Sequence, residues 1–202
     1  VVTTPKYKTT QDQFSWQNDW TAGSSKWMTA LEWRGVKVDS DKSLDVTSQT
    51  TRSAVLGFQN SQEVHLYQAS IRRDEVAGLA GQNTGNLGYG YRLNSSWMAR
   101  ANVGTAFHAP TFNDLYWPLD MVNFFQGNPH LKPETSVNKE IALQYAADRT
   151  EFGVTAYQNR ISNLIAYYSD PVTYMGTMNN IGVADIQGVT INYGKSVAGW
   201  KW

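Results

Sequence analysis

Apolar and polar residues alternate along most of this chain, which is the pattern of β-strands with one apolar and one polar face. The alternation is clearest at residues 11–20, where Phe14, Trp16 and Trp20 share one parity and polar residues occupy the other. Turn-forming residues divide the pattern into about nine strands. We predict these strands near residues 11–20, 26–38, 48–59, 63–73, 86–93, 96–107, 138–147, 150–168 and 179–193. The predicted fold class is therefore all-β, with antiparallel strands in up-and-down order.

The connections between the predicted strands alternate in length. Short turns are expected near residues 21–25, 60–62, 94–95, 148–149 and 194–199, and longer loops at 39–47, 75–82, 108–137 and 169–178. In an up-and-down sheet, alternate connections lie at opposite ends, so one end carries short turns and the other carries long loops. This asymmetry, together with strands of about 10–13 residues, is typical of outer-membrane β-barrels. The single helix expected is Thr111 to Tyr116, with Thr111 as its N-cap.

The alternation leaves two architectures open. In a membrane barrel the polar face lines a wet lumen, whereas in a soluble sheet the aromatic residues fill a core or stack on a ligand. The chain has eight Trp, eleven Tyr and seven Phe on a largely polar background. In the barrel, the aromatic residues near strand ends form girdles at the membrane interfaces. The girdle candidates are Trp16, Trp20, Trp27, Trp33, Tyr89, Tyr91, Trp97 and Tyr145.

Composition excludes several function classes. The 202 residues include 17 basic and 17 acidic ones, so net charge gives no reason to expect a nucleic-acid partner. There is no cysteine for a disulfide or a thiolate metal site, and no catalytic constellation is recognisable. We therefore expect no enzymatic activity, no cofactor and no metal site. One alternative stays open, because His108 and His130 share the long loop and are possible haem or metal ligands.

The stretch Val103–Ser136 departs from the strand pattern. It holds four of the six prolines, each of which removes a backbone donor and interrupts a strand ladder. It is nevertheless rich in aromatic and aliphatic side chains. A loop of about thirty residues with that composition is either functional or packed onto other parts of the protein.

This loop and the next one supply the candidate ligand contacts. Stacking aromatic side chains with a few polar groups suit large flat ligands that have amide edges, corrinoids among them. The bland alternative is that the aromatic residues anchor the loops on the rim of the sheet. The candidates in the first loop are Asn113, Asp114, Tyr116, Trp117, Phe124 and Phe125, and those in the second are Tyr168, Asp170 and Tyr174.

Several segments, in this order along the chain, resemble the TonB-dependent outer-membrane receptors. They are GTAFHAPTFNDLY at 104–116, GNPHLKPE at 127–134, YQNRISNLI at 157–165, NNIG at 179–182 and IQGV at 186–189. Thr190 stands where the family usually has Glu, which is a small departure. Within the family, AFHAPTFNDLYWP followed closely by GNPHLKPE is most similar to the cobalamin receptors. Residues 86–194 carry the resemblance, and residues 1–85 fit as further barrel strands.

The resemblance implies an active transporter in the outer membrane of a Gram-negative bacterium. Its ligand would be cobalamin, with a ferric siderophore or haem as the alternative, and its other partners would be outer-membrane lipid and the TonB complex. The family's barrel has 22 strands and is occluded by an N-terminal plug that contacts TonB. We expect residues 1–202 to be part of such a barrel, without the plug. About nine strands cannot close it, so two open sheet edges and non-native self-association are expected.

Overall fold

The computed structural model describes residues 6–41, 44, 46–197 and 200–201, most of which lie in strands. No helix within these residues is long and apolar enough to span a membrane. The main sheet contains β1 (Tyr7–Ala22), β2 (Ser25–Ser40), β3 (Ser48–Gln62), β4 (His65–Val76), β5 (Gln82–Arg92), β6 (Trp97–His108), β7 (Glu134–Ala147), β8 (Thr150–Ser162), β11 (Val183–Val197) and β12 (Trp200–Lys201). The remaining elements are α1 (Phe112–Tyr116), β9 (Ile165–Ser169) and β10 (Gly176–Asn180).

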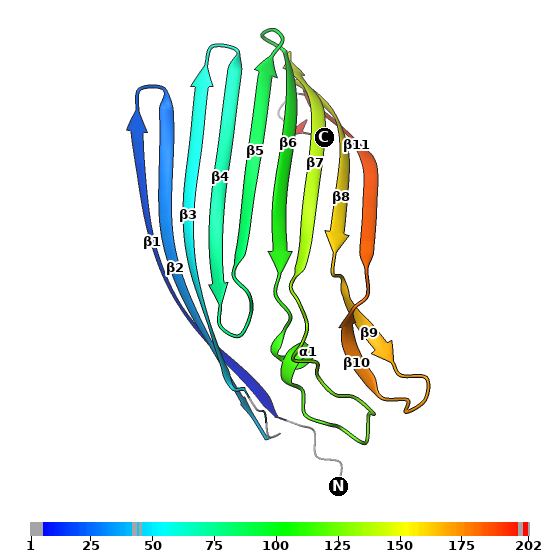
Figure 1. Ribbon diagram of the computed structural model, residues 1–202. Helices are drawn as coiled ribbons and strands as arrows, with labels where there is room; N and C mark the ends of the chain where they lie inside the picture. Colours follow the sequence, from blue (N-terminus) through cyan, green and yellow to red (C-terminus); the bar gives the residue numbers. More distant parts are fainter. Residues whose placement is uncertain (1–5, 42–43, 45, 198–199, 202) are drawn as a thin grey trace.

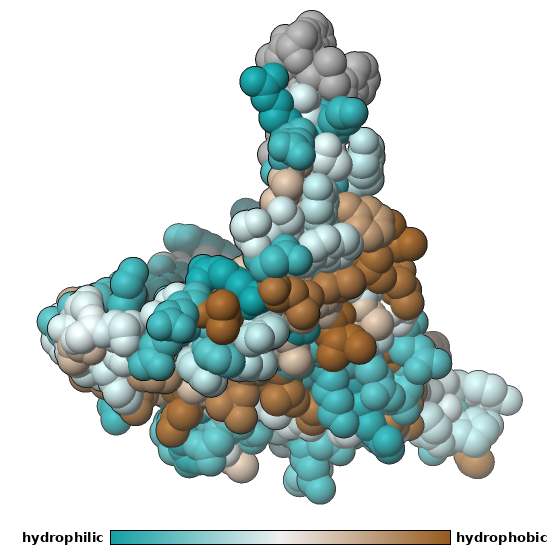
Figure 2. Space-filling view, turned by 90° about the horizontal axis from the view of Figure 1, so that it is seen from above, coloured by the Kyte–Doolittle hydropathy of each residue, from teal (hydrophilic) through white to brown (hydrophobic). Residues whose placement is uncertain are grey.

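The sheet is an antiparallel meander in which each strand pairs with the next along the chain, except that β8 pairs with β11. The sheet is curved and open, with β1 at one edge and the β11–β12 end at the other (Figure 1). Seen from the short-turn end, the molecule has an open outline and not a closed ring (Figure 2). The predicted all-β, up-and-down architecture is confirmed, and the two open edges match the expectation from the strand count.

The predicted difference between the two ends of the sheet is also confirmed. The two-residue turns 23–24, 63–64 and 148–149 and the turn 93–96 lie at one end. The ends of β2, β4, β6 and β8 and the connections 77–81, 109–133 and 163–182 lie at the other end, where Figure 1 shows α1 and the β9–β10 hairpin. The turn predicted at 60–62 occurs slightly later, because β3 continues to Gln62 and pairs there with His65.

Two strand predictions near the C-terminus are wrong in their extent. The predicted strand 150–168 breaks after Ser162, since Asn163 has a positive φ of 56° and β9 then leaves the sheet. The predicted strand 179–193 breaks at 181–182, where Gly182 has a φ of 134°. The loop predicted at 169–178 is partly strand β10, which pairs with β9. Of the predicted turn 194–199, residues 194–197 continue β11, and residues 198–199 lie outside the described residues.

The register places the apolar residues on one face of the sheet. Directly paired residues share a face, and the pairs include Leu56 with Ile71, Leu87 with Val103, and Ala101 with Ile141. These side chains are exposed: Leu87 is 62% accessible and Ile141 65%. Only a few apolar residues are buried among those described, namely Ala30, Val38, Val76, Leu115 and Leu131. An exposed apolar face of this extent needs an apolar environment.

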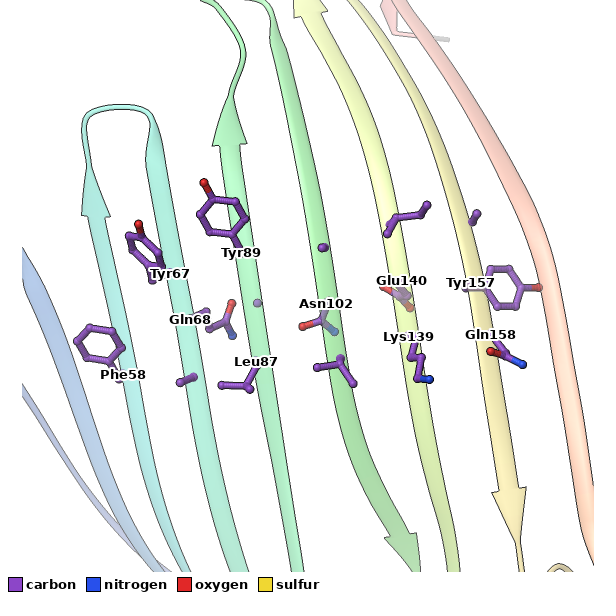
Figure 3. A pocket seen from close by; sticks show the side chains of 16 residues that line it. Phe58, Tyr67, Gln68, Leu87, Tyr89, Asn102, Lys139, Glu140, Tyr157 and Gln158 are labelled. Atoms are coloured by element: carbon purple, nitrogen blue, oxygen red, sulfur yellow. The ribbon is translucent and has the colours of Figure 1, made fainter.

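A hollow of about 830 Å³ crosses this apolar face over β3 to β8 (Figure 3). It forms because the small residues Ala69 and Ala101 lie between larger ones such as Tyr67, Leu87 and Ile141. Lys139 and Gln158 are among the polar residues that border it. Its mainly hydrocarbon lining offers few groups to orient a polar ligand, and it suits alkyl chains.

Aromatic side chains of the apolar face gather near the short-turn end. Trp27 contacts Trp20 and Phe58, with ring centroids 6.3 and 4.8 Å apart, and Trp97 lies 5.0 Å from Tyr145. Tyr67 and Tyr89 also meet, with centroids 5.4 Å apart. Of the other girdle candidates, Tyr91 pairs with His65 beside the 63–64 turn. Trp16 and Trp33 lie further along β1 and β2, paired with Leu31 and Phe14, so they fall outside this row.

The opposite face carries polar and charged side chains that link neighbouring strands. The Arg72 guanidinium on β4 donates to Glu32 on β2 at 2.7 Å and to Asp74 at 2.9 Å. The Ser53 hydroxyl on β3 donates to Asp74 at 2.6 Å. The network joins three strands on a face that is expected to be wet.

Candidate ligand-binding site

Two long connections at one end of the sheet form a single body, which we call the rim. Its members are loop 109–133 and segment 163–182, which lie side by side in Figure 1. The Asn180 amide donates to the carbonyl oxygens of Lys132 at 2.9 Å and Asn163 at 2.7 Å, and its own oxygen accepts from the Lys132 N–H at 2.9 Å. Asn128 donates to the Met178 carbonyl at 3.0 Å. Side-chain amides therefore join the two segments.

Backbone contacts complete this connection. Gln126 N–H donates to the Gly176 carbonyl at 3.0 Å, and Gly176 N–H donates to the Phe124 carbonyl at 2.6 Å. The Glu134 carboxylate accepts from the N–H of Ile165 at 2.6 Å. Asn128, Glu134 and Asn180 all belong to the sequence segments that resemble the receptor family. Their observed role is to hold the rim together.

Helix α1 sits at the start of loop 109–133, as predicted. Thr111 is its N-cap, and the pair forms a capping box: Asp114 N–H donates to the Thr111 hydroxyl oxygen, and Thr111 N–H donates to the Asp114 carboxylate. Leu115 is buried beneath the helix, with 2% exposure. A methyl group added at Gly78 would lie 3.4 Å from the Tyr116 hydroxyl, so α1 reaches over the β4–β5 connection.

A cavity of about 640 Å³ lies between the two segments of the rim, and we call it the rim cavity. Met121 is 62% exposed, Phe124 48% and Tyr168 43%, so these apolar side chains are available to a ligand. Hydroxyl, amide and carboxylate groups are also present in the lining. The lining residues are Leu119, Met121, Phe124, Gln126, Gly127, Tyr168, Asp170, Thr173, Met175, Gly176, Thr177 and Asn179.

The structure brings together three of the predicted contact residues, Phe124, Tyr168 and Asp170, in the lining of the rim cavity. Tyr174 is at the β9–β10 turn and is 72% exposed. Phe125 is half-buried and stacks on Tyr167, with ring centroids 6.4 Å apart.

The other four candidates, like Phe125 and Tyr174, lie outside the cavity lining. Asn113, Asp114 and Tyr116 belong to α1, and Trp117 caps its C-terminus. The Asp114 carboxylate accepts from both the N–H and the hydroxyl of Thr111, at 2.8 and 2.7 Å. These residues therefore contribute to the shape of loop 109–133.

Sequence reasoning missed Met121, Met175, Gln126 and Thr173, all of which line the cavity. The chain carries a signal for the segments that hold two of them. Asp120-x-Val122 and Asp170-x-Val172 begin two segments of the same design, each with an aromatic residue four positions after the aspartate. Met121 directly follows the first aspartate, and Met175 lies five positions after the second. We call residues 120–125 and 170–175 the rim tips.

Each rim tip is held by its aspartate. Asp120 accepts from the N–H groups of Val122 and Asn123 at 3.0 and 3.2 Å. Asp170 accepts from the N–H groups of Val172 and Thr173, both at 2.8 Å. The hydrogen bonds from the N–H groups of Thr173 and then Val172 hold the pKa of the Asp170 carboxyl below its usual value.

Each tip also carries an aromatic residue in the left-handed region of backbone conformation. Phe124 has a φ of 49° and Tyr174 a φ of 59°. For a residue with a Cβ atom, this conformation costs on the order of 1 kcal/mol. Glycine is the residue that adopts it without strain.

The structure places the histidines that were left open as metal or haem ligands. Within the described part of the chain, no group of three or more His, Asp or Glu side chains is placed to hold a metal ion. His108 ends β6, and His130 lies on the exposed part of loop 109–133. His65 is on the apolar face, with its Nδ1 2.8 Å from the Tyr89 hydroxyl.

The sequence matches the family model described as TonB dependent receptor-like, beta-barrel, over residues 2–202. Among curated proteins, it is 30% identical over 190 residues to a vitamin B12 transporter BtuB of Vibrio vulnificus, which covers 90% of this chain and 29% of that protein. It is 39% identical over 132 residues to BtuB of Photobacterium profundum, covering 63% of this chain and 21% of that protein. The chain thus spans less than a third of the length of these relatives.

Solved structures share the fold. The siderophore receptor PirA from Pseudomonas aeruginosa superposes with a TM-score of 0.85 at 19% identity, covering 93% of this chain and 37% of that one. The copper transporter OprC superposes with a TM-score of 0.78 at 14% identity, covering 98% of this chain and 37% of that one. At these identities the likeness concerns the fold and not the ligand.

Proposed function

This chain belongs to the TonB-dependent receptor β-barrel family, and from that premise we propose that it forms part of the wall and outer rim of a cobalamin transporter in a Gram-negative outer membrane. The chain would supply binding surface and catalyse no reaction. In the larger barrel that we propose, other parts of the full-length protein would supply the plug and the remaining strands.

The two faces of the sheet support a position in a membrane. The exposed apolar face and its row of aromatic side chains suit lipid and a membrane interface, and the polar face suits a wet lumen. In such barrels the short turns are periplasmic and the long loops extracellular. The rim would therefore face the outside, where a ligand arrives.

The rim cavity is the observation that carries the ligand proposal. It is large, about 640 Å³, and it combines aromatic rings and thioethers with amide and hydroxyl groups. Cobalamin presents a broad flat ring system with amide side chains at its edge, which calls for both kinds of contact. Two relatives that share 30–39% identity with this chain are named vitamin B12 transporters, which favours cobalamin over a siderophore or haem.

Transport against a gradient needs an energy source outside this chain. We propose that TonB supplies it through a plug in the lumen, next to the polar face. By thermodynamic linkage, a ligand that binds the rim more tightly in one plug state stabilises that state in return. The network of Arg72, Glu32 and Asp74 on the polar face is a suitable contact surface for a polar plug.

Isothermal titration of the full-length protein in detergent tests this function. Cyanocobalamin should give saturable heat, whereas haem and a ferric catecholate siderophore should give none. If a siderophore or haem gives heat and cobalamin gives none, the proposed ligand is wrong, but the family assignment still holds. A full-length protein that stays soluble and monomeric without detergent would contradict the membrane location and favour a soluble ligand-binding sheet.

A further inference from the structure

The two rim tips repeat one design at two places in the chain. In each tip an aspartate accepts two backbone N–H groups, and an aromatic residue with positive φ follows four positions later. The aspartates are thereby committed to the shape of the turns. The aromatic residues Phe124 and Tyr174 are the part of the design that the turn itself does not need, because glycine fits this backbone conformation better.

Burial in the protein does not account for these aromatic side chains. Phe124 is 48% exposed and Tyr174 is 72% exposed. An L-residue held in the left-handed region is usually retained because the surrounding packing requires it or because the site has a function. Packing does not require two rings that are this exposed, so a function of the site is the better explanation for keeping them.

The tips are held beside each other, so Phe124 and Tyr174 lie on the same part of the rim, although only Phe124 lines the rim cavity. Gly176 N–H donates to the carbonyl of Phe124 itself, and Gly176 follows Tyr174 by two residues. Phe125 and Gly176 also form a parallel bridge. The Phe124 side chain lines the rim cavity, together with Met175 from the other tip.

We propose that Phe124 and Tyr174 are a pair of ligand-contacting residues whose strained backbone holds their rings outward for stacking on a broad, flat ligand surface. This inference rests on the proposed function and deepens it, since it names the residues that recognise the planar ring system. Polar groups of the cavity, such as Gln126 and Thr173, would then contact the ligand edge. In this arrangement the protein keeps a small local strain, and the ligand supplies the contacts that the exposed rings lack.

Replacing each aromatic residue by glycine separates this role from a structural one, because the two roles predict opposite changes. Phe124→Gly and Tyr174→Gly remove the strain, so the backbone amides of the ligand-free tips should exchange hydrogen more slowly or at an unchanged rate. The same variants should bind cyanocobalamin about three- to tenfold more weakly, since each loses one ring contact. Phe124→Tyr keeps a ring and should keep the affinity. All variants are compared in the full-length protein in detergent.

Arg149→Gly is the matched control. Arg149 also has a positive φ, 61°, but it lies in a short turn at the opposite end of the sheet. This variant should leave the cobalamin affinity unchanged. Glycine variants of the tips that bind as tightly as the wild type would overturn the inference and leave the proposed function standing. Glycine variants whose tip amides exchange hydrogen faster and which bind cobalamin more weakly would also overturn it. A purely structural role of the aromatic residues predicts both of these changes. Absence of cobalamin binding by the wild type would remove the proposed function and this inference together.

Discussion

At the scale of single residues, Gly127 lies where loop 109–133 folds back on its own backbone. A Cβ atom added there would come within 2.6 Å of Trp117 N and 2.8 Å of the Leu115 carbonyl carbon. Both neighbours are backbone atoms, so a small side-chain movement cannot relieve the overlap. The N–H of Gly127 also donates to the Trp117 carbonyl at 2.9 Å, which fixes the close approach.

Gly127→Ala should therefore open the rim and destabilise it by about 1–3 kcal/mol. The loss should appear as faster amide hydrogen exchange in residues 113–128 and, for the proposed ligand cobalamin, as weaker binding. Gly88→Ala is the control, because the added methyl would meet the Asn102 side chain at an ordinary 3.4 Å. Equal behaviour of the two variants would mean that the loop tolerates a larger separation of its backbone segments.

Asp170 makes the second rim tip sensitive to pH. Hydrogen bonds from Thr173 and Val172 lower its pKa in the folded protein below the ordinary value of 3.8. A carboxyl with a lowered folded pKa stabilises the fold above its unfolded pKa, and this contribution is lost as pH falls through the folded value. Protection of the amides of Val172 and Thr173 should thus be constant at neutral pH and decline below about pH 4.

Asp170→Asn is the test of that assignment. The amide keeps an oxygen that can accept the same hydrogen bonds but does not titrate. Amide protection in residues 171–174 should be somewhat lower than in the wild type at pH 7 and should lose its acid dependence. A variant whose acid dependence matches that of the wild type would show that another group titrates.

At the scale of elements, alternation predicted nearly every strand of the main sheet, because a strand with one apolar face leaves a local trace in the sequence. The breaks after Ser162 and Asn180 leave no such trace. Residues 165–169 and 176–180 are as strand-like as their neighbours, and they leave the sheet where side chains from distant segments bind the backbone.

Of the residues that line the rim cavity, Phe124, Tyr168 and Asp170 were identified from the composition of the two loops. Met121 and Met175 were not, because they line one cavity only through the contact that joins Phe124 to Gly176.

Asn180 contributes two hydrogen bonds with Lys132 to the joining of the two rim segments. Its replacement by alanine leaves the carbonyl oxygens of Lys132 and Asn163 without these donors, at a cost of about 0.5–1.5 kcal/mol for each exposed hydrogen bond. We expect Asn180→Ala to separate loop 109–133 from the β9–β10 hairpin while the main sheet stays intact. Spin labels at residues 123 and 173 should show a broader distance distribution.

Gln187→Ala serves as the comparison, because this exposed residue lies on β11 outside the rim. It should leave the distance distribution unchanged. If Asn180→Ala left it unchanged as well, the backbone contacts of Gly176 would be sufficient to join the segments.

At the scale of the whole molecule, a single assignment of faces explains the open apolar surface, the polar network and the unequal loops. Leu87 is 62% exposed on the apolar face, and Gln68 is exposed on the polar face of the neighbouring strand. In a membrane barrel, arginine is costly on the lipid side and tolerated on the lumen side. Leu87→Arg should therefore lower the unfolding free energy of the full-length barrel in lipid vesicles by about 2–4 kcal/mol if Leu87 lies near the bilayer midplane.

Gln68→Arg introduces the same charge on the other face and should change the unfolding free energy by less than about 1 kcal/mol. Urea titrations of both variants, followed by tryptophan fluorescence, measure the difference. A larger loss for Gln68→Arg would reverse the assignment of the faces, and with it the position of the Arg72 network in the lumen. If Leu87→Arg causes the larger loss of unfolding free energy, as we expect, the apolar hollow of Figure 3 lies against lipid, because Leu87 is part of its lining.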